Sequence, residues 1–89
     1  MPARFRKAIF ISNHATQQLA FRGAVELEVL EAIRGADWKP AELGRLECRK
    51  DYSYEKEWNG KYYKTKQVRP IFVEEETRIV VVTVYVYYS

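Results

Sequence analysis

The segment that decides the fold is "RIVVVTVYVYY", residues 78–88. Its β-branched and aromatic residues predict a strand, and it is far shorter than the roughly 20 apolar residues that a membrane-spanning helix needs. A strand that is apolar on both faces is usually central in its sheet. Because side chains alternate along a strand, we expect one face to pack against helices and the other to keep its hydroxyl groups. The first face would carry Val80, Val82, Val84 and Val86, and the second Ile79, Val81, Thr83, Tyr85 and Tyr87.

A chain reversal at "EEET", residues 74–77, is expected to join this strand to the one before it. The simplest register pairs Phe72 with Ile79 and therefore places Lys66 directly across from Tyr85. Without a bulge, the face that carries Thr83 and Tyr85 would also receive Arg49, Ser53, Lys64 and Lys66.

An earlier reversal at "WNGK", residues 58–61, is the clearest hairpin signal in the chain. Asn-Gly accepts the positive φ angles of a type I′ two-residue turn. Placing Asn59 and Gly60 in that turn sets Trp58 opposite Lys61. It also sets Glu55 opposite Lys64. Residues 45–88 are therefore predicted to form an antiparallel meander.

Two helices are predicted upstream, over residues 13–35. Ser12 and Asn13 are good N-cap residues, so the first helix should run from His14 to Phe21, with Gly23 as its C-terminal stop. The second should run from Val25 to Arg34 and end at Gly35, and residues 36–44 should form a loop. Residues 1–12 are expected to be an arm or a short strand that adds an extra edge. The predicted fold class is α+β, with two N-terminal helices packed on a three- to four-stranded twisted antiparallel sheet.

Composition narrows the function classes. The length of 89 residues predicts one domain spanning 1–89. Cys48 and His14 are the only residues of their types, so no internal disulfide and no zinc spacing is possible, and no cofactor is expected. The basic start "MPARFRKAIFIS" lacks a signal-peptide pattern, so we expect a cytoplasmic protein. Phosphate-binding glycine loops and hydrolase triads are absent from the sequence.

Charge is distributed unevenly, although the net charge is only +3. Residues 45–69 contain eight basic and four acidic residues, and the N-terminal arm is also basic. This excess predicts either an electrostatic footprint for phosphate or an ordinary solvated hairpin, and the sequence leaves both open. The candidate nucleic-acid-binding residues are Arg49, Lys64, Lys66 and Arg69. Trp58 is expected to pack, or to offer a stacking platform at the hairpin tip.

His14 raises the main chemical question. On a helix, His14, Gln18 and Arg22 line one flank because each step of four residues drifts by only about 40°. An imidazole that titrates near neutral pH, beside a permanent cation, suits phosphodiester cleavage without a metal. The alternative is that His14 packs or caps the first turn while Arg22 interacts with the last carbonyls. Cys48 is expected to be a core thiol rather than a nucleophile.

A family resemblance rests on the run "ISNHATQQLAFRGAVELEVLEAIRG" and on the closing "IVVVTVY". They resemble an uncharacterised bacterial family, domain of unknown function 4258, whose members begin with a similar helix and close on a V-x-T-V-Y strand. The specific matches are His14, Ala15, Arg22, Gly23, Thr83, Val84 and Tyr85. Gln18 stands where that pattern usually has arginine, so one expected phosphate contact is missing. Val25 stands where a helix-capping serine or threonine is common.

That family is similar in pattern to the RelE-like and barnase-like ribonuclease superfamily, many of whose members are toxins of toxin-antitoxin pairs. The resemblance implies a metal-independent endoribonuclease-like domain in which His14 is the general acid or base. Arg22 and Lys66 would stabilise the phosphate, and Thr83 and Tyr85 would position it. The alternative is a catalytically inactive relative that binds RNA or a small antitoxin-like protein through the same surface. The sequence leaves open whether the chain is an enzyme, and it does not determine the oligomeric state.

Overall fold

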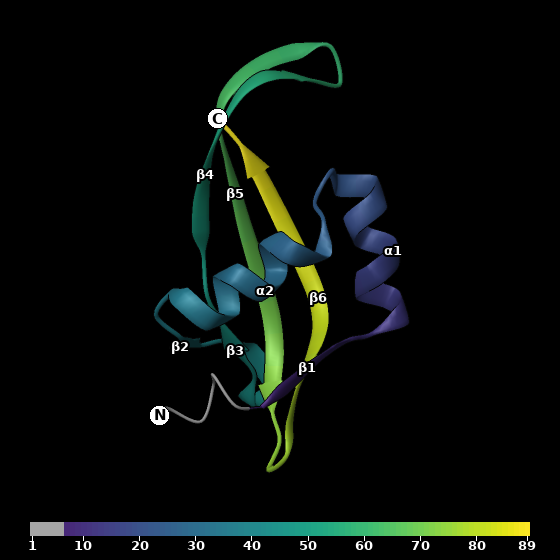
Figure 1. Ribbon diagram of the computed structural model, residues 1–89, viewed down its shortest axis with the longest axis vertical. Helices are drawn as coiled ribbons and strands as arrows, with labels where there is room; N and C mark the ends of the chain where they lie inside the picture. The colour runs from purple at the N-terminus through teal and green to yellow at the C-terminus, as the bar shows by residue number, and fades with distance from the viewer. Residues whose placement is uncertain (1–6) are drawn as a thin grey trace.

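The computed structural model describes residues 7–89 and shows two helices packed on one six-stranded sheet (Figure 1). The N-terminal arm was noted above for its basic residues. Two of these, Arg4 and Arg6, lie outside the described residues. The strand order is β1-β6-β5-β3-β2, and β4 pairs with β5 beyond β3. The elements are β1 (Ala8–Ile11), α1 (Asn13–Arg22), α2 (Glu26–Gly35), β2 (Lys39–Pro40), the 3₁₀ helix η2 (Glu42–Gly44), β3 (Leu46–Glu47), β4 (Lys50–Trp58), β5 (Lys61–Glu74) and β6 (Arg78–Tyr88).

The predicted fold class was wrong about the sheet. The sheet has six strands instead of three or four, and it is mixed, because β1 pairs in parallel with β6 from Ala8↔Arg78 to Ile11↔Val81. The helical segments are also not limited to the two predicted helices, since η2 follows α2 in what was predicted to be a loop. Strands β2 and β3 have two residues each, so they are too short to show the alternation by which a strand is recognised in a sequence.

The helices begin and end close to the predicted residues. The Ser12 hydroxyl accepts a hydrogen bond from the Ala15 N–H at 3.2 Å, and Gly23 closes α1 with a φ of 77°. The sequence prediction therefore missed one residue at each end of α1. No helix in the described part of the chain is long and apolar enough to cross a membrane.

One face of the sheet is covered and the other is open. Helix α2 crosses the covered face and α1 lies along β6 (Figure 1). The apolar core lies between these layers, where Val29 and Ile33 of α2 are fully buried with Val68 and Phe72 of β5. Fully burying a side chain of this size stabilises the fold by about 1.5–3 kcal/mol. What we call the open face carries Gln67, Arg69 and Ile71 of β5 and their partners on β6, which are Tyr87, Tyr85 and Thr83.

A β-bulge in β6 changes which residues enter the core. Ile71 pairs with Thr83 while Phe72 pairs with Val81, so Val82 has no partner on β5. An extra residue reverses the in-and-out alternation beyond it. Ile79 and Val81 before the bulge are therefore fully buried, as is Val84 after it. The predicted core face of Val80, Val82, Val84 and Val86 was wrong in its first half.

The turn register also differs from the prediction. Phe72 pairs with Val81 rather than Ile79, and the bulge adds a further shift, so Tyr85 pairs with Arg69 and Lys66 pairs with Tyr88. The prediction that Lys66 lies across from Tyr85 was therefore wrong. Lys66 instead faces α2 on the covered face.

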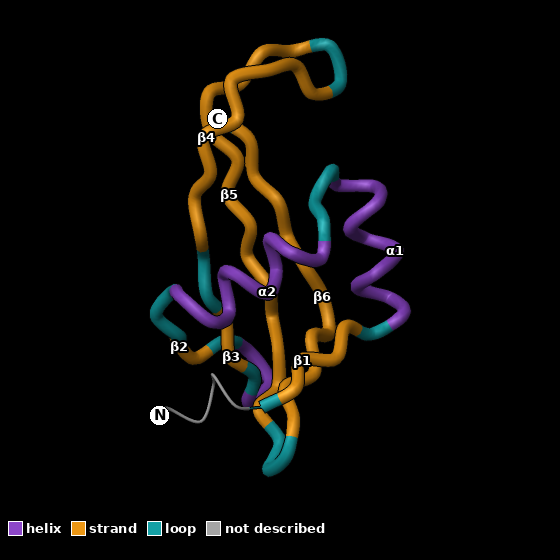
Figure 2. Tube along the Cα trace, in the orientation of Figure 1, coloured by secondary structure: helices purple, strands orange, loops and turns teal. Residues whose placement is uncertain are grey.

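The β4–β5 hairpin extends past both helices (Figure 2). Trp58 pairs with Lys61 as predicted. The expected Glu55–Lys64 pair was wrong, because the register shifts between Ser53 and Lys56. Glu55 itself has a φ of 51°. This second bulge bends the hairpin, so the pairing set at the tip does not continue toward the sheet.

Candidate functional site

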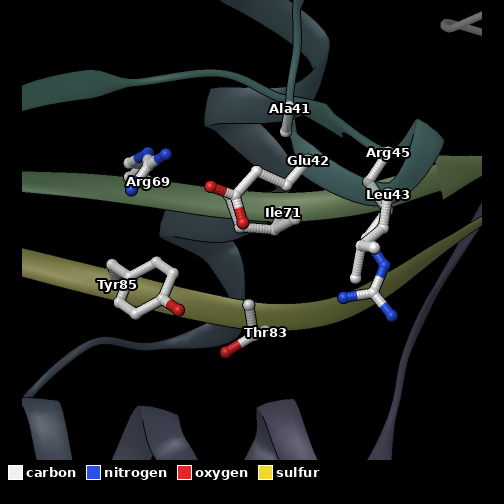
Figure 3. Close-up of a pocket in the computed structure, with 8 residues that line it drawn as sticks. All are labelled: Ala41, Glu42, Leu43, Arg45, Arg69, Ile71, Thr83 and Tyr85. Atoms are coloured by element: carbon white, nitrogen blue, oxygen red, sulfur yellow. The ribbon is translucent and has the colours of Figure 1, made fainter.

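A pocket of about 240 Å³ lies on the open face, between the sheet and the turn formed by residues 41–45 (Figure 3). The turn folds over Ile71, which is only 6% exposed although it faces away from the helices. Strands β5 and β6 form the floor and the turn forms the wall. The lining residues are Ala41, Glu42, Leu43, Arg45, Arg69, Ile71, Thr83 and Tyr85.

Tyr85 lies between two guanidinium groups at one end of this pocket. The Cζ atoms of Arg22 and Arg69 are 5.0 Å and 5.4 Å from the centroid of its ring. Each contact at a partly exposed site is worth about 0.5–1 kcal/mol. Tyr85 as a whole remains 38% exposed, so it keeps a surface that a ligand can contact. Helix α1 and strand β5 thus bring two permanent cations to one aromatic side chain.

Glu47 and Tyr87 hold Arg69 in place. Its Nε donates to Glu47 Oε2 at 2.8 Å, its Nη2 donates to the same oxygen, and its Nη1 donates to the Tyr87 hydroxyl at 3.2 Å. The hydrogen bonds from Arg69 lower the pKa of Glu47 despite burial, which acts in the opposite direction, and the charges of Arg69, Arg49 and Lys39 lower it further. Glu47 therefore stays ionised. Arg69 is a fixed cation, with N–H groups left over because a guanidinium has five.

Gln18 and Arg22 of α1 bind the edge of β6 beyond its pairing with β1. Gln18 Oε1 accepts from the Val84 N–H at 3.0 Å, and Arg22 Nη1 donates to the Val84 carbonyl at 2.6 Å. Gln18 Oε1 also accepts from the Thr83 hydroxyl. Helix side chains thus satisfy an edge that would otherwise be free to pair with another strand. Thr83 can only accept a hydrogen bond from a ligand, because its own proton is used.

His14 is exposed, and in the described part of the chain its side chain makes no hydrogen bond or ion pair. It lies one helical turn before Gln18, or about 6 Å along the axis, on the same flank of α1. That flank meets β6 at Thr83 and Val84, beside the pocket. The prediction that His14 packs in the core or caps the helix therefore finds no support, since Ser12 makes the cap.

Three of the four predicted catalytic residues lie together where α1 meets β6, whereas the predicted nucleic-acid-binding residues are scattered. Arg22 contacts Tyr85, and Gln18 links Thr83 to the same helix flank. Of the four basic residues, only Arg69 lines the pocket. Arg49 is half-exposed, with its Nη2 at 3.7 Å from Glu47 Oε1.

Lys66 and Lys64 lie away from the site. Lys66 is 6% exposed on the covered face, where its Nζ lies 2.9 Å from Glu28 Oε1 and donates to the Gly23 carbonyl at 2.6 Å. Lys64 is exposed, and its N–H donates to the Ser89 carbonyl at the end of β6. It is five residues from Arg69, or about 17 Å along the strand.

Sequence reasoning missed the wall of the pocket, which contributes Glu42, Leu43 and Arg45. The sequence predicts a loop over residues 36–44 and indicates no functional residue there. The signal that was available is Gly44 directly after Leu43, since glycine at the second central position marks a tight turn.

Cys48 is buried and lines a separate cavity of about 230 Å³. Within residues 7–89, no three His, Cys, Asp or Glu side chains lie close enough to hold a metal ion.

No family model, curated protein or solved structure matches this chain. The resemblance to the uncharacterised bacterial family and to the RelE-like ribonucleases therefore stays a prediction.

Proposed function

We propose that the open face binds RNA and that the chain is a metal-independent endoribonuclease-like domain of toxin type. The observation that carries the proposal is the partly exposed Tyr85 ring held between Arg22 and Arg69 at the end of the pocket. Guanidinium groups bind phosphate oxygens with matching geometry, and aromatic rings stack on bases. Both halves of a nucleotide therefore have a complementary group at this site.

Cleavage of RNA needs three things from the protein. A base must take the proton of the 2′-hydroxyl as its oxygen attacks phosphorus, and an acid must give a proton to the departing 5′-oxygen as its bond to phosphorus breaks. Cations must stabilise the extra charge on the phosphate in between. His14 and the Glu42 carboxylate are the candidate proton carriers, and Arg22 and Arg69 the candidate cations. Figure 3 shows the Tyr85 hydroxyl directed toward Thr83. Tyr85 would donate to a phosphate oxygen, whereas Thr83, whose proton goes to Gln18, would accept from a ribose hydroxyl.

A cleavage assay on total RNA in the presence of a metal chelator tests this proposal. The parent protein is expected to cleave, and His14→Ala and Glu42→Gln are each expected to slow cleavage by roughly 100-fold or more if that residue transfers a proton. Lys64→Gln is the matched control, because it removes an exposed charge away from the pocket. Unchanged cleavage by the double variant His14→Ala, Glu42→Gln would contradict the assignment of the proton carriers.

A second candidate function is RNA binding without cleavage. It is favoured by the hydrogen bonds of Arg22 to Val84 and of Thr83 to Gln18, which give these side chains a structural task at the β6 edge. This reading predicts salt-dependent RNA binding with no cleavage products. Absence of RNA binding at low salt would leave a protein partner, such as the antitoxin-like protein implied by the resemblance.

A further inference from the structure

The turn that walls the pocket has an unusual residue in it. The Arg45 N–H donates to the Glu42 carbonyl at 3.2 Å and closes a four-residue turn. Both central residues have positive φ, 61° at Leu43 and 72° at Gly44. This is the pattern of a type I′ turn, which favours asparagine, aspartate or glycine at the first central position. Leucine is disfavoured there, because its side chain crowds the backbone in the left-handed region.

The same chain builds another turn of this kind with the favoured residues. At the tip of the β4–β5 hairpin, Asn59 has a φ of 52° and Gly60 a φ of 84°. The two turns therefore differ mainly in the first central residue. Asn59 is exposed at a tip that lines neither of the two cavities described above, whereas Leu43 lines the pocket on the open face.

Burial does not compensate for the strain at Leu43. Its side chain is 84% exposed, so it gains little from packing in the free protein. A strained backbone and an exposed apolar side chain thus coincide at one pocket residue, and local strain of this kind tends to occur where a ligand is held. The compensation is expected to come from a bound molecule.

We infer that Leu43 packs against a nucleobase of single-stranded RNA that enters the pocket, and this inference rests on the proposed function. Leu43 lies toward the other end of the pocket from Tyr85 (Figure 3), and an apolar side chain there suits the flat, weakly polar face of a base. The cavity of about 240 Å³ is smaller than the roughly 300–1,000 Å³ of sites that enclose whole drug-sized ligands, so it has room for one base rather than a longer segment.

The same geometry selects the strandedness of the RNA. In a duplex the faces of the bases are stacked on one another, so only an unpaired, unstacked base can present its face to Leu43. Arg45 closes the turn, two residues after Leu43, and makes no ion pair with a described residue. Its charge is therefore available for the phosphate next to the base that contacts Leu43.

The test compares Leu43→Asn with Asn59→Leu. Binding is measured for a mixed-sequence single-stranded oligoribonucleotide of about 12 nucleotides and for an abasic oligomer of equal length and charge. Leu43→Asn is expected to raise the melting temperature, because it relieves the turn, and to weaken binding of the intact oligomer roughly tenfold. Its affinity for the abasic oligomer and its salt dependence should equal those of the parent. Asn59→Leu should lower the melting temperature and leave both affinities unchanged.

Each other outcome overturns a defined part of the inference. Equal affinity of Leu43→Asn and the parent for the intact oligomer shows that Leu43 contacts no base. Equal weakening for both oligomers shows a contact with the backbone instead. If the parent binds neither oligomer at low salt, the proposed function is wrong. The inference about Leu43 is then wrong as well, because it depends on RNA binding. If the parent binds both but Leu43→Asn has no effect, the inference alone fails.

Discussion

Lys66 and Arg69 are three residues apart on β5, yet they lie on opposite faces of the sheet and have different partners. Lys66 is buried against α2, beside the Glu28 carboxylate and the Gly23 carbonyl. Arg69 faces the pocket, held by Glu47 and Tyr87. A buried cation with two partners joins the helices to the sheet, whereas a fixed cation at a pocket is available to a ligand. A basic residue in a strand therefore cannot be assigned to binding until its face is known.

The largest expected effect is on the covered face. Lys66→Met leaves the Glu28 carboxylate and the Gly23 carbonyl without their cation in a largely buried place, which should lower the free energy of unfolding by about 3 kcal/mol. Urea denaturation measures this loss. RNA affinity per folded molecule should not change.

A double variant shows whether the loss comes from the unpaired carboxylate. Lys66→Met together with Glu28→Gln should recover part of the stability, because the remaining partner is then neutral. A Lys66→Met protein that is as stable as the parent, or that loses RNA affinity while folded, would remove the distinction between the two faces.

A smaller effect is expected from pH on the open face. The pKa of Glu47 is lowered in the folded protein, chiefly by its hydrogen bonds with Arg69, so its ionised form stabilises the fold above the ordinary glutamate pKa of 4.5. That stabilisation should be lost as the pH falls below this value and through the folded pKa. In Glu47→Gln this part of the pH dependence should be absent. Parallel stability-against-pH curves for the parent and the variant would show that the Glu47–Arg69 pair contributes nothing.

Local signals in the sequence predicted the helices and the hairpin tip well. Helix α1 is bounded by the Ser12 cap and by Gly23, and the Asn59-Gly60 turn sets its own register, because each feature depends only on adjacent residues. Neither bulge was predictable in this way. A bulge at Val82 is favoured only when the strands on both sides and the core beneath are in place.

The residues of the candidate site divide in the same way, into those predicted from local sequence signals and those that depend on the folded sheet. Arg22 was predicted from the helix flank, and Thr83 and Tyr85 were implied by the family resemblance and placed on one face by strand alternation. These three residues lie together. Lys66 was misplaced by the bulge and the turn register. Leu43 and Arg45 were missed, because two-residue strands and a five-residue turn give no periodic pattern, and only the folded sheet shows that the turn covers Ile71.

The salt dependence of RNA binding tests the central claim, that the open face binds RNA, most directly. The equilibrium affinity of a single-stranded oligoribonucleotide is measured against salt for the parent, Arg69→Gln and Lys64→Gln. If Arg69 contacts a phosphate, the Arg69→Gln slope of log affinity against log salt should be smaller by roughly 0.7, the value for one contact to a single strand, and the Lys64→Gln slope should match the parent. Equal slopes for all three proteins, or a reduced slope for Lys64→Gln alone, would contradict the claim.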